Sequence, residues 1–264
     1  MCPLMLNFIY RRVGEEPMKT IDKTVRVLDA LTETNGARVA ELADRLEMPN
    51  STVHAHLAAL KRHGFVRSSG DHYALGLKFL FYGGAVLYGN SEYSLLDSKV
   101  TMLAEETGER AQFITEQNGR GFYLYAETES DTAVQTDVRM GKIVDLHPTA
   151  AGKAILAHLP RERVDEIIDQ YGLDAYTEHT ITDRDELLAE LDRIRERGYS
   201  VNDEERIPKQ MAIGVPVLDK LGEVVGAFSV SGPAHRIRNE EHRARIISLL
   251  LGTANEVELN LVYQ

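Results

Sequence analysis

The sequence has 264 residues, a formal net charge of −11 and an ordinary globular composition, with 43% hydrophobic and 27% charged residues. This composition excludes a disordered chain, and the single cysteine, Cys2, excludes an internal disulfide framework and a cysteine-based zinc site within one chain. No apolar run approaches the ~20 residues that span a bilayer, so we expect no membrane partner and a reducing, cytoplasmic setting.

Residues 1–17 differ from the periodic segments that follow them. The stretch Met1–Tyr10 is apolar, but Arg11 and Arg12 come after it instead of before it, and no small-residue cleavage site follows. A signal peptide is therefore not expected. Because Met18 stands directly before the first periodic helix, we interpret residues 1–17 as a loose tail or as the product of a start codon assigned too far upstream.

Residues 18–76 predict a compact unit of three helices and a hairpin. Helical periodicity covers 20–34, 38–47 and 51–63, with a proline turn before the third helix. The first predicted helix has one apolar stripe, made of Ile21, Val25, Leu28 and Leu31. Two short β-rich runs around a Ser-Ser-Gly-Asp turn end the unit. Helix, helix, tight turn, helix and hairpin is the order of a winged helix-turn-helix.

The helix over 51–63 has the properties of a DNA recognition helix. Val53, Leu57 and Leu60 share its inward side, which leaves small and polar residues outward. Small side chains allow close approach to the major groove, and hydroxyls near the helix start can contact phosphates or base edges. The residues that we expect to contact DNA are Arg38, Asn50, Ser51, Thr52, His54, Ala55, His56, Arg62 and Arg67.

Two other interpretations of this unit stay open. Winged helices also serve as protein-docking modules. The histidines at 54, 56, 63 and 72 could suggest a metal, but residues two apart on a helix diverge and no acidic or thiol partner is in register. We therefore expect groove-flanking or surface histidines and no metal site.

Charge is unevenly divided along the chain. Residues 18–75 carry eight basic and seven acidic side chains, whereas residues 76–264 carry 20 basic and 32 acidic ones. Affinity for phosphates depends on cations, so a nearly neutral module should bind DNA modestly by itself and need dimerisation.

Residues 77–90 are expected to form a linker helix. The run LKFLFYGGAVLYG is apolar on most faces, and a twin chain is the natural partner of such a helix. The alternative is burial against the protein's own C-terminal domain.

The remaining residues, 91–264, alternate predicted helices and strands. Helices are expected over 91–107, 151–158, 161–171, 183–197 and 239–262, and strands over 110–117, 121–127, 212–218 and 223–231. Antiparallel strands with flanking helices predict an α+β domain of the kind that senses small molecules.

The small-residue loop at 147–154 (HPTAAGKA) is the first candidate site of this domain. A phosphate-binding P-loop needs a glycine where His147 stands and a serine or threonine where Ala154 stands, so a nucleotide site is not expected. The free N–H groups of the helix start could hold an anion such as a carboxylate, or the loop is simply a well-capped helix start.

Two polar stretches follow. Residues 198–205 (GYSVNDEE) gather three acids, which we interpret mostly as a solvated loop, and in 229–231 two serines face one side of a strand. No nucleophile, histidine and acid stand at a recognisable spacing, so we expect neither an enzyme nor a cofactor.

Together these segments resemble the IclR (isocitrate-lyase-regulator) family of bacterial and archaeal transcription factors, from Lys19 to Leu261. The resemblance is carried by TIDKTVRVLDAL, STVHAHLAALKRHGFV, LHPTAAGKAILA, GYSVNDEE and VPVLDKLGEVVGAFSVSGP. It implies a winged-helix DNA reader, a dimerising linker helix and a GAF-like effector domain that responds to an organic acid or to an intermediate of sugar or aromatic breakdown. It further implies palindromic operators bound by homodimers or tetramers. The effector-binding positions that it implies are Ala150, Ala151, Asn202, Gln210, Ala212, Ser229 and Ser231.

The sequence departs from the family pattern at three places. Asn202 replaces a common aspartate, Lys209-Gln210-Met211-Ala212 replaces the usual run after the acids, and Ala55 replaces a common arginine of the recognition helix. We therefore expect an effector and a base preference of its own. Arginines outnumber lysines and acids are plentiful, which either indicates a high-salt cytoplasm, as in a halophilic archaeon, or is an acidic solvated surface.

Overall fold

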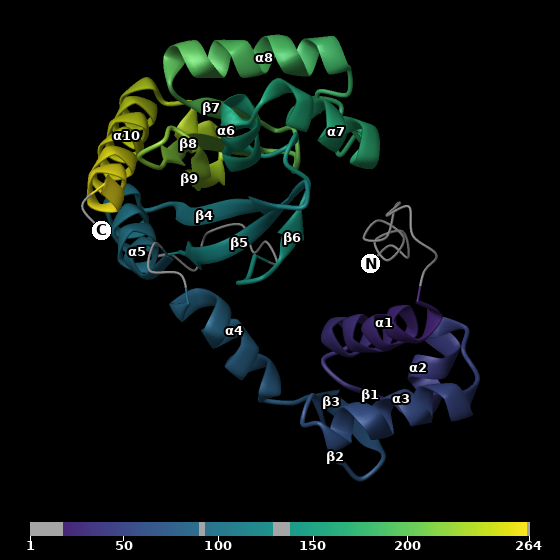
Figure 1. Ribbon diagram of the computed structural model, residues 1–264. Coiled ribbons are helices and arrows are strands. Elements are labelled where there is room, and N and C mark those ends of the chain that lie inside the picture. Colours follow the sequence, from purple (N-terminus) through teal and green to yellow (C-terminus); the bar gives the residue numbers. More distant parts are fainter. Residues whose placement is uncertain (1–17, 90–92, 129–137, 263–264) are drawn as a thin grey trace. The chain divides into compact units, whose positions relative to one another are not determined.

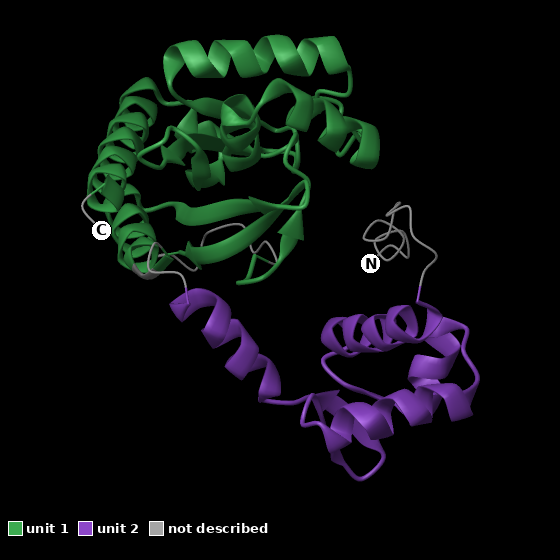
Figure 2. Cartoon of the chain, in the orientation of Figure 1, with its two compact units in different colours: residues 1–11, 92–264 green, residues 12–91 purple. Residues whose placement is uncertain are grey.

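The computed structural model describes residues 18–89, 93–128 and 138–262 (Figure 1). The chain divides into two compact units, one over residues 12–91 and one that contains residues 92–264 (Figure 2). The tail that the sequence predicts over residues 1–17 lies outside the described residues. Among the described residues, no helix has both the length and the apolar composition needed to cross a membrane.

The N-terminal unit is a winged helix-turn-helix followed by one further helix. Its elements are α1 (Lys19–Glu33), β1 (Ala37–Arg38), α2 (Val39–Leu46), α3 (Asn50–Arg62), β2 (Val66–Ser69), β3 (His72–Leu75) and α4 (Lys78–Tyr88). The wing is a three-stranded sheet in the order β1-β3-β2, and not the two-stranded hairpin that the sequence predicts. The extra strand is only two residues long, and pairing with β3 defines it.

The core of this unit corrects one detail of the sequence analysis. Val53, Leu57 and Leu60 of α3 are buried, as expected. On α1, however, the buried residues are Val27, Ala30 and Leu31, whereas Ile21 is 54% exposed. The helix is rotated relative to the predicted stripe because α2 and α3 both pack on the side that carries Val27.

The C-terminal unit is an α+β domain, as predicted. Its elements are η2 (Tyr93–Leu95), α5 (Leu96–Thr107), β4 (Arg110–Gln117), β5 (Arg120–Glu127), β6 (Ile143–Val144), α6 (Ala150–His158), α7 (Arg161–Tyr171), α8 (Arg184–Arg197), β7 (Ser200–Asp203), β8 (Gln210–Leu218), β9 (Val224–Pro233), α9 (Ala234–Ile237) and α10 (Glu240–Val262). Six strands form one antiparallel sheet in the order β6-β5-β4-β9-β8-β7.

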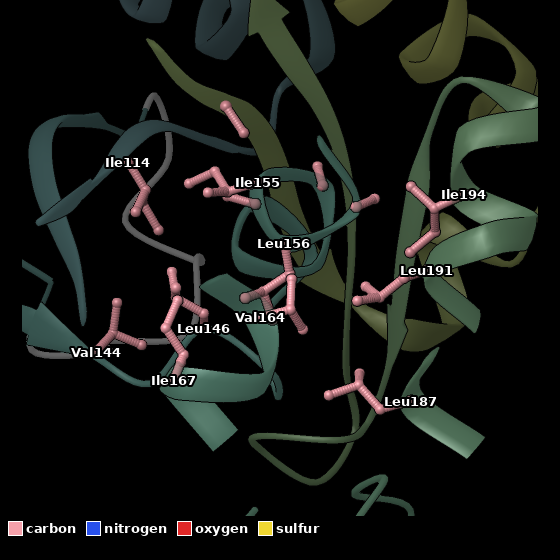
Figure 3. Close-up of a cluster of buried hydrophobic side chains, with 14 of the residues drawn as sticks. Ile114, Val144, Leu146, Ile155, Leu156, Val164, Ile167, Leu187, Leu191 and Ile194 are labelled. Carbon is pink, nitrogen blue, oxygen red and sulfur yellow. The ribbon is translucent and has the colours of Figure 1, made fainter. Parts of the chain in front are cut away.

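Helices cover both faces of this sheet. On one face, α6 packs over the sheet and buries a cluster that α7 and α8 extend, with Ile114, Ile155 and Leu191 among its members (Figure 3). Strand alternation puts Phe113 and Phe228 on the opposite face, where their rings meet at 4.8 Å and where α5 and α10 contact the sheet (Figure 1). We call the first of these surfaces the α6 face.

The stretch 198–205 is not the solvated loop that the sequence analysis favours. Ser200–Asp203 form edge strand β7, Ser200 and Asn202 are buried, and Glu205 is only 6% exposed. It is a strand because it pairs with β8, the next strand along the chain, and that pairing cannot be inferred from residues 198–205 alone.

Candidate functional site

The recognition helix α3 presents a small polar face. With Val53, Leu57 and Leu60 turned inward, four of the predicted contact residues are exposed along the helix: Ser51, His54, Ala55 and Arg62. Asn50 at the helix start is exposed as well, and Thr52 is half-buried. All of them except Arg62, the last residue of α3, lie in the N-terminal half of the helix, which is the end that recognition helices direct toward base edges.

His56 and Arg38 are engaged with other protein groups. His56 is half-buried, and its Nδ1 lies 2.9 Å from the Thr24 hydroxyl of α1. Arg38 pairs with Asp71 of the wing turn, with Nε and Oδ2 2.8 Å apart, and both side chains are mostly exposed. Arg67 is exposed on β2, the other outer strand of the same small sheet, opposite Ala74 of β3. The wing therefore offers one arginine directly and one that an aspartate neutralises.

The first half of helix α4 packs against Phe65, the residue before strand β2 of the wing. The ring of Phe65 packs edge-on against Phe79, with the ring centroids 5.1 Å apart, and stacks on Tyr82, with the centroids 5.7 Å apart. None of the α4 residues is buried, and Leu80, Phe81 and Val86 are each more than 60% exposed. Such an exposed apolar run is typical of a surface that another chain covers.

The α6 face carries two rows of polar and small residues that run across four strands. In the first row Ser200, Gly214, Ser229 and Gln112 are register partners on β7, β8, β9 and β4. In the second row the partners are Asn202, Ala212, Ser231 and Arg110. The sheet thus brings four predicted effector residues together: Asn202, Ala212, Ser229 and Ser231. Gln210 lies at the start of β8, beyond these rows, and is half-buried.

Gln112 joins the two rows. Its Nε2 donates to Ser229 Oγ at 2.8 Å and to Ser231 Oγ at 3.3 Å, and Ser231 Oγ donates to Gln112 Oε1 at 3.3 Å. All three side chains are more than 90% buried. This amide and the two hydroxyls form a set of adjustable donors and acceptors inside the domain.

Helix α6 begins directly above this polar surface. Thr149 caps it by accepting the Gly152 N–H at 3.0 Å, and Ser200 Oγ donates to the Ala150 carbonyl at 2.6 Å. A Cβ at Gly214 would lie 2.6 Å from the Ala150 backbone, so only glycine permits this approach. The N–H groups of Ala150 and Ala151, in the first turn, have no acceptor within the helix and suit an anion.

Asn202 holds the loop before α6. Its Nδ2 donates to the Pro148 carbonyl at 2.6 Å, and its Oδ1 accepts the Glu205 N–H at 3.0 Å. Both ends of the amide are therefore used within the protein. An asparagine suits this position because it donates and accepts at once, whereas an ionised aspartate could only accept.

Lys153 and Glu205 form a buried ion pair one turn into α6. Their side chains are 2% and 8% exposed, and Lys153 Nζ donates to Glu205 Oε1. Burial raises the pKa of the Glu205 carboxyl, and Lys153 acts against that rise. The pair fastens the β7–β8 connection to α6 and fixes the outline of the polar surface.

Two arginines add positive charge near the rows. Arg110 is 8% exposed, its Nε donates to Thr128 Oγ1 at 3.2 Å, and burial lowers its pKa. Arg206 follows β7. Burial raises the pKa of the Tyr123 hydroxyl on β5, and the charges of both guanidinium groups act against that rise.

Sequence reasoning missed Gln112, Arg110, Tyr123 and Arg206. The alternation of β4 contains a signal for the first two, because Arg110, Gln112 and Ile114 share one face at period two. Only the pairing of β4 with β9 shows that this face meets the two serines. Among the described residues, no group of three or more histidine, cysteine, aspartate or glutamate side chains could hold a metal ion.

Comparisons with known proteins agree with both units. A profile described as the IclR helix-turn-helix domain matches residues 20–70, and one described as the bacterial transcriptional regulator IclR C-terminal domain matches residues 94–259. The chain belongs to the IclR family. It is similar to a probable HTH-type transcriptional regulator ArcR of Halobacterium salinarum, at 33% identity over 90% of this chain and 91% of that protein. The transcriptional repressor IclR of Escherichia coli is 28% identical over 92% of this chain and 89% of the repressor.

Solved structures of the family give the same picture. The IclR structure from Thermotoga maritima has a TM-score of 0.77 at 30% identity and covers 93% of this chain and 99% of its own. The inducer-binding domain of the transcription factor PobR from Acinetobacter, solved as a double mutant with 3-hydroxybenzoic acid, has a TM-score of 0.57 at 26% identity and covers 62% of this chain and 96% of its own.

The IclR-family chain is accordingly a transcriptional regulator and not an enzyme. Its N-terminal helix-turn-helix binds operator DNA, and its C-terminal domain binds a small-molecule effector.

Proposed function

We propose that this regulator binds its operator as a homodimer, or as a pair of dimers, and that a small organic acid bound on the α6 face changes this binding. The DNA contacts come from the predicted residues of α3 and the wing. The effector carboxylate lies between the first turn of α6 and the set formed by Gln112, Ser229 and Ser231. The protein works in the cytoplasm, where its operator is.

One observation carries the proposed effector class. Buried donors from separate elements converge on the α6 face: the Gln112 amide, two serine hydroxyls, the N–H groups of the α6 start and the nearby guanidinium groups. A helix N-terminus together with hydroxyl, amide and guanidinium donors favours a carboxylate over a neutral or cationic molecule. The PobR domain is a family relative whose bound 3-hydroxybenzoic acid is also a carboxylic acid.

The exposed apolar surface of α4 supports the proposed dimer. Leu80, Phe81 and Val86 are 71%, 70% and 62% exposed, and the DNA-binding unit is close to neutral. A neutral module gains little from phosphate attraction, so two linked modules on one operator are needed for tight binding. Covering the α4 residues with a second chain would provide that link.

The test measures operator binding by fluorescence anisotropy at a fixed, stated salt concentration. The probe is the DNA upstream of the protein's own gene, with and without a panel of organic acids. We expect sequence-specific retention that at least one acid alters, loss of retention in Ser51→Glu, and loss of the acid response alone in the double variant Ala151→Glu/Ser229→Ala. Ser248→Glu, on the exposed side of α10, is the matched charge control. Retention no stronger than on random DNA would reject the proposal.

A further inference from the structure

The guanidinium of Arg206 stands out among the arginines of the C-terminal domain. Its Nη1 is buried and has no hydrogen-bond partner, and no ion pair of Arg206 exists in the described part of the chain. The arginines around it each have an ion pair: Arg120 with Asp145, Arg236 with Glu109, and Arg238 with Asp203 and Glu204. The Nε of Arg236 also lacks a hydrogen-bond partner, but its Nη2 is paired. A buried cationic nitrogen without a partner costs free energy unless a bound group compensates it.

The side chain of Arg206 has different neighbours from the three acidic side chains that precede it. Glu205 turns to Lys153 of α6, and Asp203 and Glu204 turn to Arg238, with each N–O distance to Arg238 at 2.7 Å. The Cζ of Arg206 lies 5.9 Å from the ring centroid of Tyr176, and its charge acts on the hydroxyl of Tyr123, a member of the buried cluster under α6. Glu205 and Arg206 are therefore the side chains of this turn that face inward, and of the two only Glu205 has an ion-pair partner among the described residues.

The main chain at Arg206 is held firmly. Thr177 Oγ1 donates to the Glu204 carbonyl at 2.7 Å, and Thr180 Oγ1 donates to the Glu205 carbonyl. The Tyr176 hydroxyl donates to Asp145, which keeps the ring in place beside the guanidinium. An arginine positioned in this way loses little conformational entropy when it binds an anion.

We propose that Arg206 binds a second acidic group of the effector, so that the effector is a dicarboxylic acid and not a monocarboxylic one. This rests on the proposed function, in which the first carboxylate lies between the α6 start and the Gln112–Ser229–Ser231 set. The two anchors come from different elements, β4 and β9 for one and the turn after β7 for the other. A guanidinium recognises a carboxylate with two parallel N–H groups, which suits the unpartnered Nη1.

The test compares matched acids on the full-length protein by isothermal titration calorimetry. Succinate, glutarate and adipate are compared with butanoate, pentanoate and hexanoate, which have the same carbon numbers and one carboxylate fewer. At least one diacid should bind about 10- to 100-fold more tightly than its monoacid, as expected for a hydrogen bond to a charged group. Arg206→Gln should remove that difference and leave the affinity for the monoacid within about threefold, because only the second carboxylate loses its partner.

Arg238→Gln is the matched control. It removes the cation after α9 that is already paired with Asp203 and Glu204 of the turn, so it should keep the preference for diacids. Equal binding of diacids and monoacids to the wild type overturns the inference while leaving the proposed function intact, and so does a preference that survives in Arg206→Gln. Binding of no acid at all overturns both. Should Arg206→Gln fail to fold, the wild-type comparison still decides.

Discussion

Gln112 on β4 lies opposite Ser229 on β9, and its amide donates to the Ser229 hydroxyl at 2.8 Å while also reaching Ser231. One side chain thus sets the orientation of both hydroxyls. Gln112→Leu keeps the volume but removes every polar atom that the serines use. We expect the acid effector to bind about tenfold more weakly or worse, because buried hydroxyls lose their partner, with operator affinity unchanged.

Calorimetry and operator anisotropy on the same preparation check this prediction. Gln117→Leu, at the exposed end of the same strand, is the control and should leave both affinities unchanged. Normal effector affinity in Gln112→Leu would place the carboxylate away from β4.

The pair formed by Arg38 and Asp71 gives a prediction about DNA. Because the aspartate neutralises an exposed arginine of the wing, Asp71→Asn should free that arginine for a phosphate. Operator affinity should then rise several-fold at low salt, and the slope of log K against log salt should steepen by about 0.9 if one phosphate contact is gained. Asp44→Asn, an exposed aspartate on α2, is the control, and an unchanged slope in Asp71→Asn would show that Arg38 does not reach the DNA.

The buried pair of Lys153 and Glu205 gives a prediction about stability. Lys153→Met leaves a buried carboxyl without its cation and should lower the free energy of unfolding by about 3 kcal/mol. Glu205→Gln in the Lys153→Met background should recover part of that loss, since the uncompensated charge is gone. Urea denaturation measures both, and a Lys153→Met protein as stable as the wild type would contradict the prediction.

The same variant should respond to pH in a defined direction. Burial raises the pKa of Glu205, and removing Lys153 raises it further. The folded protein then binds a proton more tightly than the unfolded chain, so the free energy of unfolding falls as pH rises from the unfolded to the folded pKa. Over this pH range the decline should be steeper in Lys153→Met than in the wild type, and it should disappear when Glu205→Gln is added.

The exposed face of α4 gives a prediction about assembly. Leu80→Glu with Phe81→Glu puts charge where a second chain would bury apolar surface, and should convert dimers to monomers in sedimentation velocity. Operator affinity should fall with it. Leu221→Glu, an equally exposed leucine in the turn between β8 and β9, is the control. A dimer that persists in the double variant would locate the interface elsewhere.

Much of the fold can be predicted from sequence periodicity. The stripe of Val53, Leu57 and Leu60 identifies the inward side of α3, and the spacing of Ser229 and Ser231 places both hydroxyls on one face of a strand. In both cases the repeat of the element itself carries the information.

Periodicity does not reveal very short strands, nor residues that join the site only because their strand pairs with another strand. Strand β1 has two residues and β7 has four, and each exists through pairing with another strand, β1 with β3 and β7 with β8. Gln112 becomes part of the site only because β4 lies beside β9. Arg206 stands next to a run of acids that pair with other cations, so composition alone indicates a solvated stretch.

Side chains at even and odd positions of strand β4 lie on opposite faces of the sheet, and the two faces have different roles. Arg110 and Gln112 point to the polar rows. Phe113, the residue after Gln112, points the other way and packs with Phe228 on the face that α5 contacts. Helix α5 is the first long helix after the linker residues 77–90. Substitutions at even positions should therefore change the affinity for the acid. Substitutions at odd positions should change how strongly acid binding alters the affinity for operator DNA. Since such coupling is reciprocal, operator DNA must alter the affinity for the acid by the same factor, whichever partner binds first.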